Sequence, residues 1–154
     1  SVIVQIKDPL QPKLQGNLVV NNPGAMRGTY RIDRIIRAIP AVNVSLTIAL
    51  QSLRTIMEQF QSRRVIFNQT NSAYACGIFT SNGKFIAVEE DIDQLNAIDK
   101  TVGFCLLNDK KMHCSGMALT SCINFNIVKK AAKAGIELII TSNMVATSLA
   151  ICEA

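Results

Sequence analysis

The 154-residue sequence has no tryptophan, one histidine and no apolar run of the length that a membrane-spanning helix needs, about 20 residues. No basic stretch leads into an apolar one, so no secretory leader is expected either. Hydrophobic residues make up 49% of the chain, which is too many for a disordered protein. The length predicts one compact domain with its own core.

Cysteine pairs are also missing: five cysteines are present, an odd number, and no two form a C-x-x-C. This favours free thiols in a reducing cytoplasm. Because His113 has few neighbouring ligands, we expect no structural metal and no zinc. Cys114 and Cys122 flank a predicted strand and are the candidates for a reactive thiol, with core packing as the alternative. The other three cysteines are expected in the core: Cys76, Cys105 and Cys152.

Several catalytic and nucleotide-binding motifs are absent. The sequence contains no G-x-G-x-x-G, no G-x-x-x-x-G-K-[ST] and no G-x-S-x-G. Zinc deaminases share the order of elements predicted below, but they need an H-x-E and a P-C-x-x-C, and neither occurs here. Deamination is therefore not expected.

Positive charge gathers at the front, where residues 1–64 hold nine Lys or Arg and three Asp or Glu. Arg27, Arg31, Arg34 and Arg37 recur at helical spacing and would attract phosphate groups. The alternative is a solvated face or an irregular basic loop. Nucleic acid is not the expected partner, because six Phe and two Tyr offer few stacking platforms.

Hydrophobic periodicity predicts alternating helices and strands after a β-rich start at residues 2–6 and 17–21. A helix should begin at Ser45, and Asn82-Gly83 predicts a hairpin of residues 74–80 and 84–88 with a type I′ turn. A helix with a buried stripe reaching Leu106 should follow. Then come a strand at 117–119, a helix capped by Thr120 or Ser121 and ended by Gly135, a strand at 136–140 and a helix at 145–154. This order predicts a mostly parallel sheet covered on both faces, with an antiparallel hairpin at its edge.

Two polar sets stand out in this arrangement. Residues 89–99 hold five carboxylates, which could perform acid–base chemistry or bind Mg²⁺, or which simply begin a helix. The second set follows the predicted strands: Thr120, Ser121, Thr141, Ser142, Thr147 and Ser148. Ligands of open α/β sheets bind at the carboxyl ends of strands, so these residues could line one crevice; helix capping explains them equally well.

Five strings resemble, in order and spacing, motifs of the FdhD/NarQ family, the formate dehydrogenase accessory sulfurtransferases. The strings are 75–79 (ACGIF), 90–100 (EDIDQLNAIDK), 120–132 (TSCINFNIVKKAA), 134–136 (AGI) and 145–150 (VATSLA). The resemblance implies a cytidine-deaminase-like three-layer α/β/α sandwich with a mixed sheet at residues 44–154. Residues 1–43 would form a partial N-terminal β segment and a basic loop.

The resemblance also implies a function. Members transfer sulfur from a cysteine desulfurase to the molybdenum cofactor of formate dehydrogenase, which carries two guanine dinucleotides, and they pair as homodimers in the cytoplasm. The implied cofactor-binding residues are those that match the family or belong to the predicted crevice and basic front: Glu90, Asp91, Asn96, Ser121, Thr147, Ser148, Arg27 and Arg31.

The sequence departs from the family pattern where the chemistry lies. No cysteine occurs in residues 28–36, where the family has its C-x-x-C, and Asp93-Gln94-Leu95 replaces the Gly, Arg and His of the signature. Other departures are Tyr74 for a His, Cys122 for an Arg and Asn126 for a Glu. Either the chain is a degenerate, non-catalytic paralogue that binds a nucleotide or a protein, or part of the family's sequence is absent, including a loop near residues 27–30 and a tail after Ala154.

Overall fold

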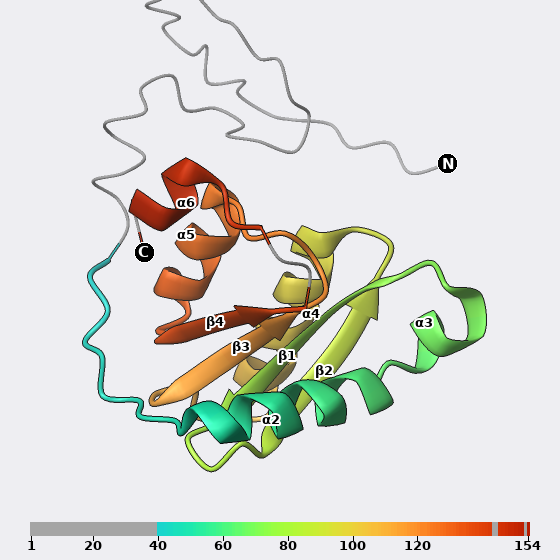
Figure 1. Cartoon of the computed structure of the whole chain (residues 1–154), viewed down its shortest axis with the longest axis horizontal. Coiled ribbons are helices and arrows are strands. Elements are labelled where there is room, and N and C mark those ends of the chain that lie inside the picture. Colours follow the sequence, from blue (N-terminus) through green and yellow to red (C-terminus); the bar gives the residue numbers. More distant parts are fainter. Residues whose placement is uncertain (1–39, 143–144, 153) are drawn as a thin grey trace, which may run out of the picture.

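The computed structural model describes residues 40–142, 145–152 and 154. Its helices are α2 (Leu50–Ser62), α3 (Val65–Thr70), α4 (Gln94–Leu107), α5 (Phe125–Lys133) and α6 (Ser148–Cys152). Its strands are β1 (Tyr74–Thr80), β2 (Phe85–Asp91), β3 (Ser115–Leu119) and β4 (Leu138–Thr141), as drawn in Figure 1. Among the described residues, no helix is both long and apolar enough to cross a membrane. The β-rich segment predicted before residue 40 lies outside the described residues.

The four strands form one mixed sheet in the order β2-β1-β3-β4. β1 pairs antiparallel with both β2 and β3, and only β3 and β4 run parallel. The α/β class and the mixed sheet are confirmed, whereas the expectation of a mostly parallel sheet is wrong. The reason is the position of the hairpin. Its strand β2 forms the edge of the sheet, but β1 lies inside the sheet and pairs antiparallel with β3 as well.

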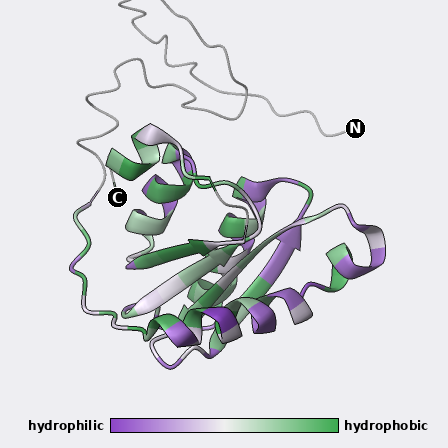
Figure 2. Ribbon diagram, viewed as in Figure 1, coloured by the Kyte–Doolittle hydropathy of each residue, from purple (hydrophilic) through white to green (hydrophobic). Residues whose placement is uncertain are grey.

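Helices cover both faces of this sheet and create two hydrophobic cores. On one face, Ile56 and Phe60 of α2 pack against Phe79 and Phe85. On the other face, α4 and α5 pack against the side chains of Ile78, Met117 and Leu119, among others. Figure 2 shows β4 as hydrophobic, although it is an edge strand, and α2 with hydrophilic and hydrophobic residues interleaved, as expected for a helix that covers one face of a sheet.

The start and the seat of α4 follow from local chemistry. Asp93 caps the helix, since its Oδ1 accepts the N–H groups of Leu95 and Asn96 at 2.8 and 3.1 Å. Thr101, fully buried, donates its hydroxyl to the carbonyl oxygens of Ala97 and Cys76, at 2.8 and 3.1 Å. The predicted role of the acidic stretch at a helix start is thus confirmed for Asp93, while Glu89, Glu90 and Asp91 still belong to β2.

Two predicted helix starts are wrong for an identifiable reason. α2 begins at Leu50 instead of Ser45, because the backbone N–H groups of Ser45 and Leu46 donate to the carboxylate of Glu137, at 2.5 and 2.6 Å. These bonds tie residues 45–46 to the residue before β4, in the segment that precedes the helix. α5 is capped by Asn124, whose Oδ1 accepts from Ile127, and not by Thr120 or Ser121. Its predicted end at Gly135 is confirmed, with φ of 73°.

The hairpin is confirmed but its turn is not of type I′. Gly83 has φ of 78°, and Asn82 has no positive φ, whereas a type I′ turn needs two. The N–H of Gly83 donates to Thr80, and the register shifts between Ile78 and Phe79. A single left-handed glycine is typical of hairpin loops longer than two residues, and the register shift marks a bulge farther along the two strands.

Burial confirms some of the predicted core and corrects the rest. Cys76 and Cys105 are fully buried. Leu106 is 63% exposed and Cys152 is exposed, so these two predictions are wrong. Leu106 follows the fully buried Cys105 by one position, roughly 100° around the helix, and therefore leaves the buried face of α4. Cys152 lies in a helix of five residues that buries Ala150 instead.

Close packing around β3 gives a testable prediction. A Cβ atom at Gly116 would lie 2.2 Å from Cζ of Phe79, which is fully buried and cannot move aside. Gly116→Ala should therefore lower the free energy of unfolding by about 1–3 kcal/mol, measured by urea denaturation. Gly103→Ala is the matched control: nothing lies within 4 Å of its Cβ position in α4, so the helix should gain about 1 kcal/mol. Equal effects at both sites would contradict this packing.

Candidate functional site

A polar crevice of about 390 Å³ lies at the carboxyl ends of β3 and β4. β1 starts there because it runs antiparallel to β3, and Thr120 links the two strands by accepting the N–H of Ala75 at 2.9 Å. The crevice is lined by side chains of the α2–α3 region, the start of β1 and the ends of the other strands: Arg64, Phe67, Asn71, Ser72, Ala73, Tyr74, Ile92, Thr120 and Ser142. The predicted position at the strand ends is the place where α/β sheets bind ligands.

Arg64 is the one cation among the residues that line this crevice. Its guanidinium carbon lies 4.3 Å from the centre of the Phe67 ring, a cation–π distance. Its Nε is buried and has no hydrogen-bond partner among the described residues. A buried donor without a partner is costly, and an anionic ligand in the crevice would supply the missing acceptor.

Glu90 anchors the segment that carries this arginine. The side chain is 7% exposed, and its two carboxylate oxygens accept the N–H groups of Ile66 and Phe67 at 2.7 and 2.8 Å. These are the first orphan amides of α3, which starts directly after Arg64. Lys100 donates to the carbonyl oxygen of Glu90 at 2.6 Å and fixes the strand end. Glu90 therefore holds the crevice wall instead of lining the crevice.

Asp91 and Asp99 of the same stretch are likewise engaged with their own chain. Asp91 accepts from the N–H of Asp93, and also contacts Asn96 and Lys100, both at 3.4 Å. The N–H of Asp93, followed by the contacts with Asn96 and Lys100, lowers the pKa of Asp91. Asp99 pairs with Lys130 of α5. The acidic cluster therefore serves as a framework joining β2, α4 and α5.

The remaining predicted site residues are scattered. Ser121 is buried, and its carbonyl oxygen accepts the hydroxyl of Thr141 at 2.7 Å. Thr147 and Ser148 are exposed at the start of α6, where the hydroxyl oxygen of Thr147 accepts the N–H of Ala150. Of the predicted polar residues, Thr120 and Ser142 line the crevice. Arg27 and Arg31 lie outside the described residues.

The two candidate thiols lie at opposite ends of β3. Cys122 is exposed and follows the strand three residues after Leu119, near the crevice end. Cys114 is partly buried and directly precedes the strand, at its amino end. Of these two thiols, Cys122 lies at the end of β3 that borders the crevice, and Cys114 lies at the other end.

The aromatic and basic wall of the crevice could not be predicted from the sequence. Arg64, Phe67 and Tyr74 come from segments that carry no recognised motif, and only the fold places them beside Thr120 and Ser142. One signal was present: Tyr74 occupies the position of the family's hairpin histidine, and it is 44% exposed at the crevice.

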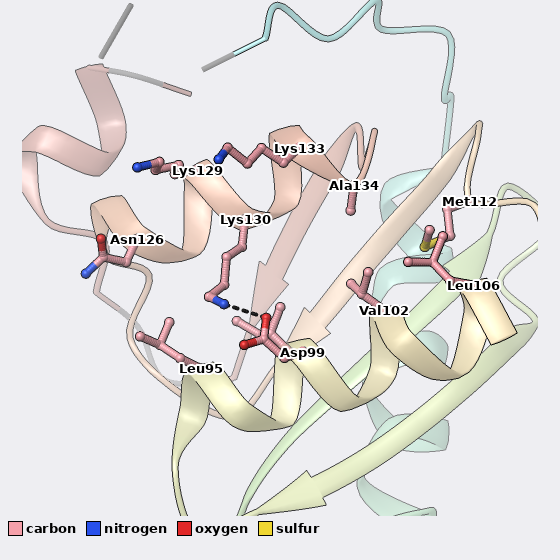
Figure 3. A pocket seen from close by; sticks show the side chains of 11 residues that line it. Leu95, Asp99, Val102, Leu106, Met112, Asn126, Lys129, Lys130, Lys133 and Ala134 are labelled. Atoms are coloured by element: carbon pink, nitrogen blue, oxygen red, sulfur yellow. Dashed lines mark hydrogen bonds and ion pairs between the residues drawn. The ribbon is translucent and has the colours of Figure 1, made fainter. Parts of the chain in front are cut away.

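A second pocket, of about 610 Å³, lies between α4 and α5 (Figure 3). Hydrophobic side chains such as Leu95 and Val102 line it, and Lys130 reaches across it to Asp99. None of the thiols and, apart from Asp99, none of the acidic stretch lines it. This pocket therefore differs from the crevice both in its position and in the residues that line it.

Comparison with known proteins places the chain in a family. The family model described as "FdhD/NarQ family" matches residues 2–154. A crystal structure from Desulfotalea psychrophila, described as a formate dehydrogenase accessory protein, superposes with a TM-score of 0.69 at 22% identity, covering 79% of this chain and 51% of that one. The chain belongs to the FdhD/NarQ family, as the sequence motifs indicated.

Curated relatives carry the name "Sulfur carrier protein FdhD". The protein of Corynebacterium efficiens is 30% identical over 139 residues, covering 90% of this chain and 50% of the relative. The protein of Thermoplasma volcanium is 32% identical over 140 residues, covering 90% of this chain and 46% of the relative. The chain thus spans about half the length of the curated relatives it matches.

The role of Glu90 can be tested by Glu90→Gln. Hydrogen bonds to a charged group contribute about 1.5–3 kcal/mol, and glutamine offers a single neutral acceptor oxygen to the two amides. We expect a loss of about 1–3 kcal/mol in urea denaturation, together with faster hydrogen exchange at Ile66 and Phe67. Glu89→Gln, next to it on β2 and without such contacts, should leave both measurements unchanged. Equal losses for the two variants would refute the anchoring role.

Proposed function

We propose that this chain is an accessory protein of formate dehydrogenase that carries sulfur and binds an anionic nucleotide cofactor in the crevice. Membership of the FdhD/NarQ family supports the accessory role, and relatives bear the name of sulfur carriers. The observation that carries the nucleotide part is the buried, unpartnered Nε of Arg64 in a polar crevice at the strand ends.

The cofactor proposed is the molybdenum cofactor with two guanine dinucleotides. Its phosphates would meet Arg64, and a guanine ring would stack beside Phe67 or Tyr74, because aromatic faces accept planar bases. Thr120 and Ser142 offer hydroxyl groups to the same ligand. The other predicted site residues would act without touching the ligand. The crevice wall would be supported by Glu90, Asp91 and Asn96, and the neighbouring turns would be shaped by Ser121, Thr147 and Ser148.

The partners proposed are a cysteine desulfurase as sulfur donor, formate dehydrogenase as recipient and a second copy of the chain, in the cytoplasm. The competing proposal is a degenerate paralogue that binds a nucleotide or a protein without carrying sulfur. The observation that favours the second proposal is the lack of a C-x-x-C anywhere in the 154 residues.

Nucleotide binding is tested by following the melting temperature during a titration with GDP. A ligand that binds only the folded state raises this temperature once it exceeds its dissociation constant. Arg64→Gln should require at least about tenfold more GDP for the same shift, since it removes a charge-assisted hydrogen bond. Arg54→Gln is the control, because Arg54 pairs with Glu58 on the exposed face of α2. No shift for the wild type at millimolar GDP would exclude the crevice as a guanine nucleotide site.

Sulfur carriage is tested by incubating the chain with a cysteine desulfurase and cysteine, then measuring intact mass. We expect a gain of one sulfur atom that dithiothreitol removes, because a persulfide is reduced by thiols. Incubation without cysteine is the control. If no sulfur is bound, the carrier proposal fails and the non-catalytic paralogue remains.

A further inference from the structure

The five thiols differ sharply in their surroundings. Burial raises the pKa of Cys76 to about 12, and burial also raises the pKa of Cys105, so both are held as unreactive thiols. Cys114, Cys122 and Cys152 are at least partly accessible. Among the described residues, no hydrogen bond reaches the sulfur of Cys122 or Cys152, whereas the sulfur of Cys114 has two polar neighbours.

Cys114 lies in a Cys–His pair. Its Sγ is 2.8 Å from Nδ1 of His113 and 2.9 Å from Oγ of Ser45. Its backbone is left-handed, with φ of 56°, a conformation that non-glycine residues adopt rarely and that is concentrated at functional sites. A nucleophile and a base within hydrogen-bonding reach of each other is the arrangement that activates a thiol.

Glu137 completes this group and fixes its geometry. Its Oε1 accepts the N–H of Cys114 at 3.0 Å, and its Oε2 accepts the N–H groups of Ser45 and Leu46. A ring nitrogen of His113, Sγ of Cys114 and a carboxylate oxygen of Glu137 all lie within 4.8 Å of one another. These N–H groups, that of Ser45 first, lower the pKa of Glu137, so its carboxylate remains an acceptor for the backbone around Cys114.

We propose that Cys114 is the thiol that accepts sulfane sulfur from a persulfide donor, with His113 as the base that receives the thiol proton. This inference rests on the proposed function and names the residue that performs it. The Cys114 thiolate attacks the terminal sulfur of a donor R–S–SH and forms a new S–S bond. The donor S–S bond breaks, R–S⁻ leaves and takes the proton from His113, and no external oxidant or reductant is needed.

The position of Cys114 limits the proposal to sulfur uptake. β3 separates Cys114 from the crevice by five residues, or roughly 17 Å at 3.3 Å per residue. A donor protein can therefore approach Cys114 beside residues 45–46 without meeting a ligand bound at the other end of the strand. Delivery to that ligand requires a further acceptor that reaches Cys114.

The test is site mapping of the sulfur. After incubation with desulfurase and cysteine, the full chain is digested and its peptides are analysed by mass spectrometry. We expect the persulfide on Cys114 of the wild type, loss of uptake in Cys114→Ser and unchanged uptake in Cys122→Ser and Cys152→Ser. His113→Ala should slow uptake about 10²-fold, the lower end for a general base, and added imidazole should restore part of the rate. Because the wild-type map locates the sulfur directly, the result does not depend on the folding of any variant.

Three results would overturn the inference. Sulfur on Cys122 or Cys152, with Cys114→Ser fully active, would refute the role of Cys114 but leave the carrier function intact. An absence of sulfur on every cysteine would refute both. Zinc bound to the wild type at one equivalent, and lost in both Cys114→Ser and Glu137→Gln, would identify the group as a metal site.

Discussion

The buried carboxylate of Glu90 is the contact on which the crevice depends. It receives two backbone amides from the first turn of α3 and stands at the end of β2, so it joins two segments that no strand pairing connects. An ionised group in the interior is tolerated when charge-assisted hydrogen bonds replace its water. Arg64 directly precedes those amides. The orientation of the crevice wall is therefore set by a residue that the ligand would never touch.

The use of the acidic stretch also decides what the crevice can bind. Asp91, Asp93 and Asp99 accept hydrogen bonds or ion pairs from their own chain, and Glu90 does the same. These oxygens are not turned toward the crevice as ligands for a cation. Arg64 is, by contrast, a donor that lacks an acceptor. This balance of charge is suited to the anionic ligand proposed above and argues against Mg²⁺ held by this carboxylate cluster.

Local sequence patterns predicted the elements well and their limits less well. The hairpin, α4, α5 and the strand before α6 all follow from periodicity, capping residues and glycine. The start of α2 could not be predicted, because the amides of Ser45 and Leu46 are bound by Glu137, about ninety residues away in the sequence. The place of Arg64 in the crevice could not be predicted for the same reason, since Thr120 and Ser142, which line the crevice with it, lie far away in the sequence. Contacts between distant residues have no periodic signature, and the family motifs marked the framework more clearly than the crevice.

The parallel pair of β3 and β4 gives the two ends of the sheet different chemistry. Both strands start beside Cys114 and Glu137, and both end at the crevice. A persulfide donor is a protein and needs an open approach, whereas a cofactor needs walls that exclude water and orient its phosphates. With the proposed uptake at one end and the proposed binding at the other, the two encounters occur without steric conflict. The cost is a separation that one side chain cannot span, so transfer between the ends requires movement of a partner or of a second thiol. A persulfide confined to Cys114 in the isolated chain would be the expected consequence of that separation.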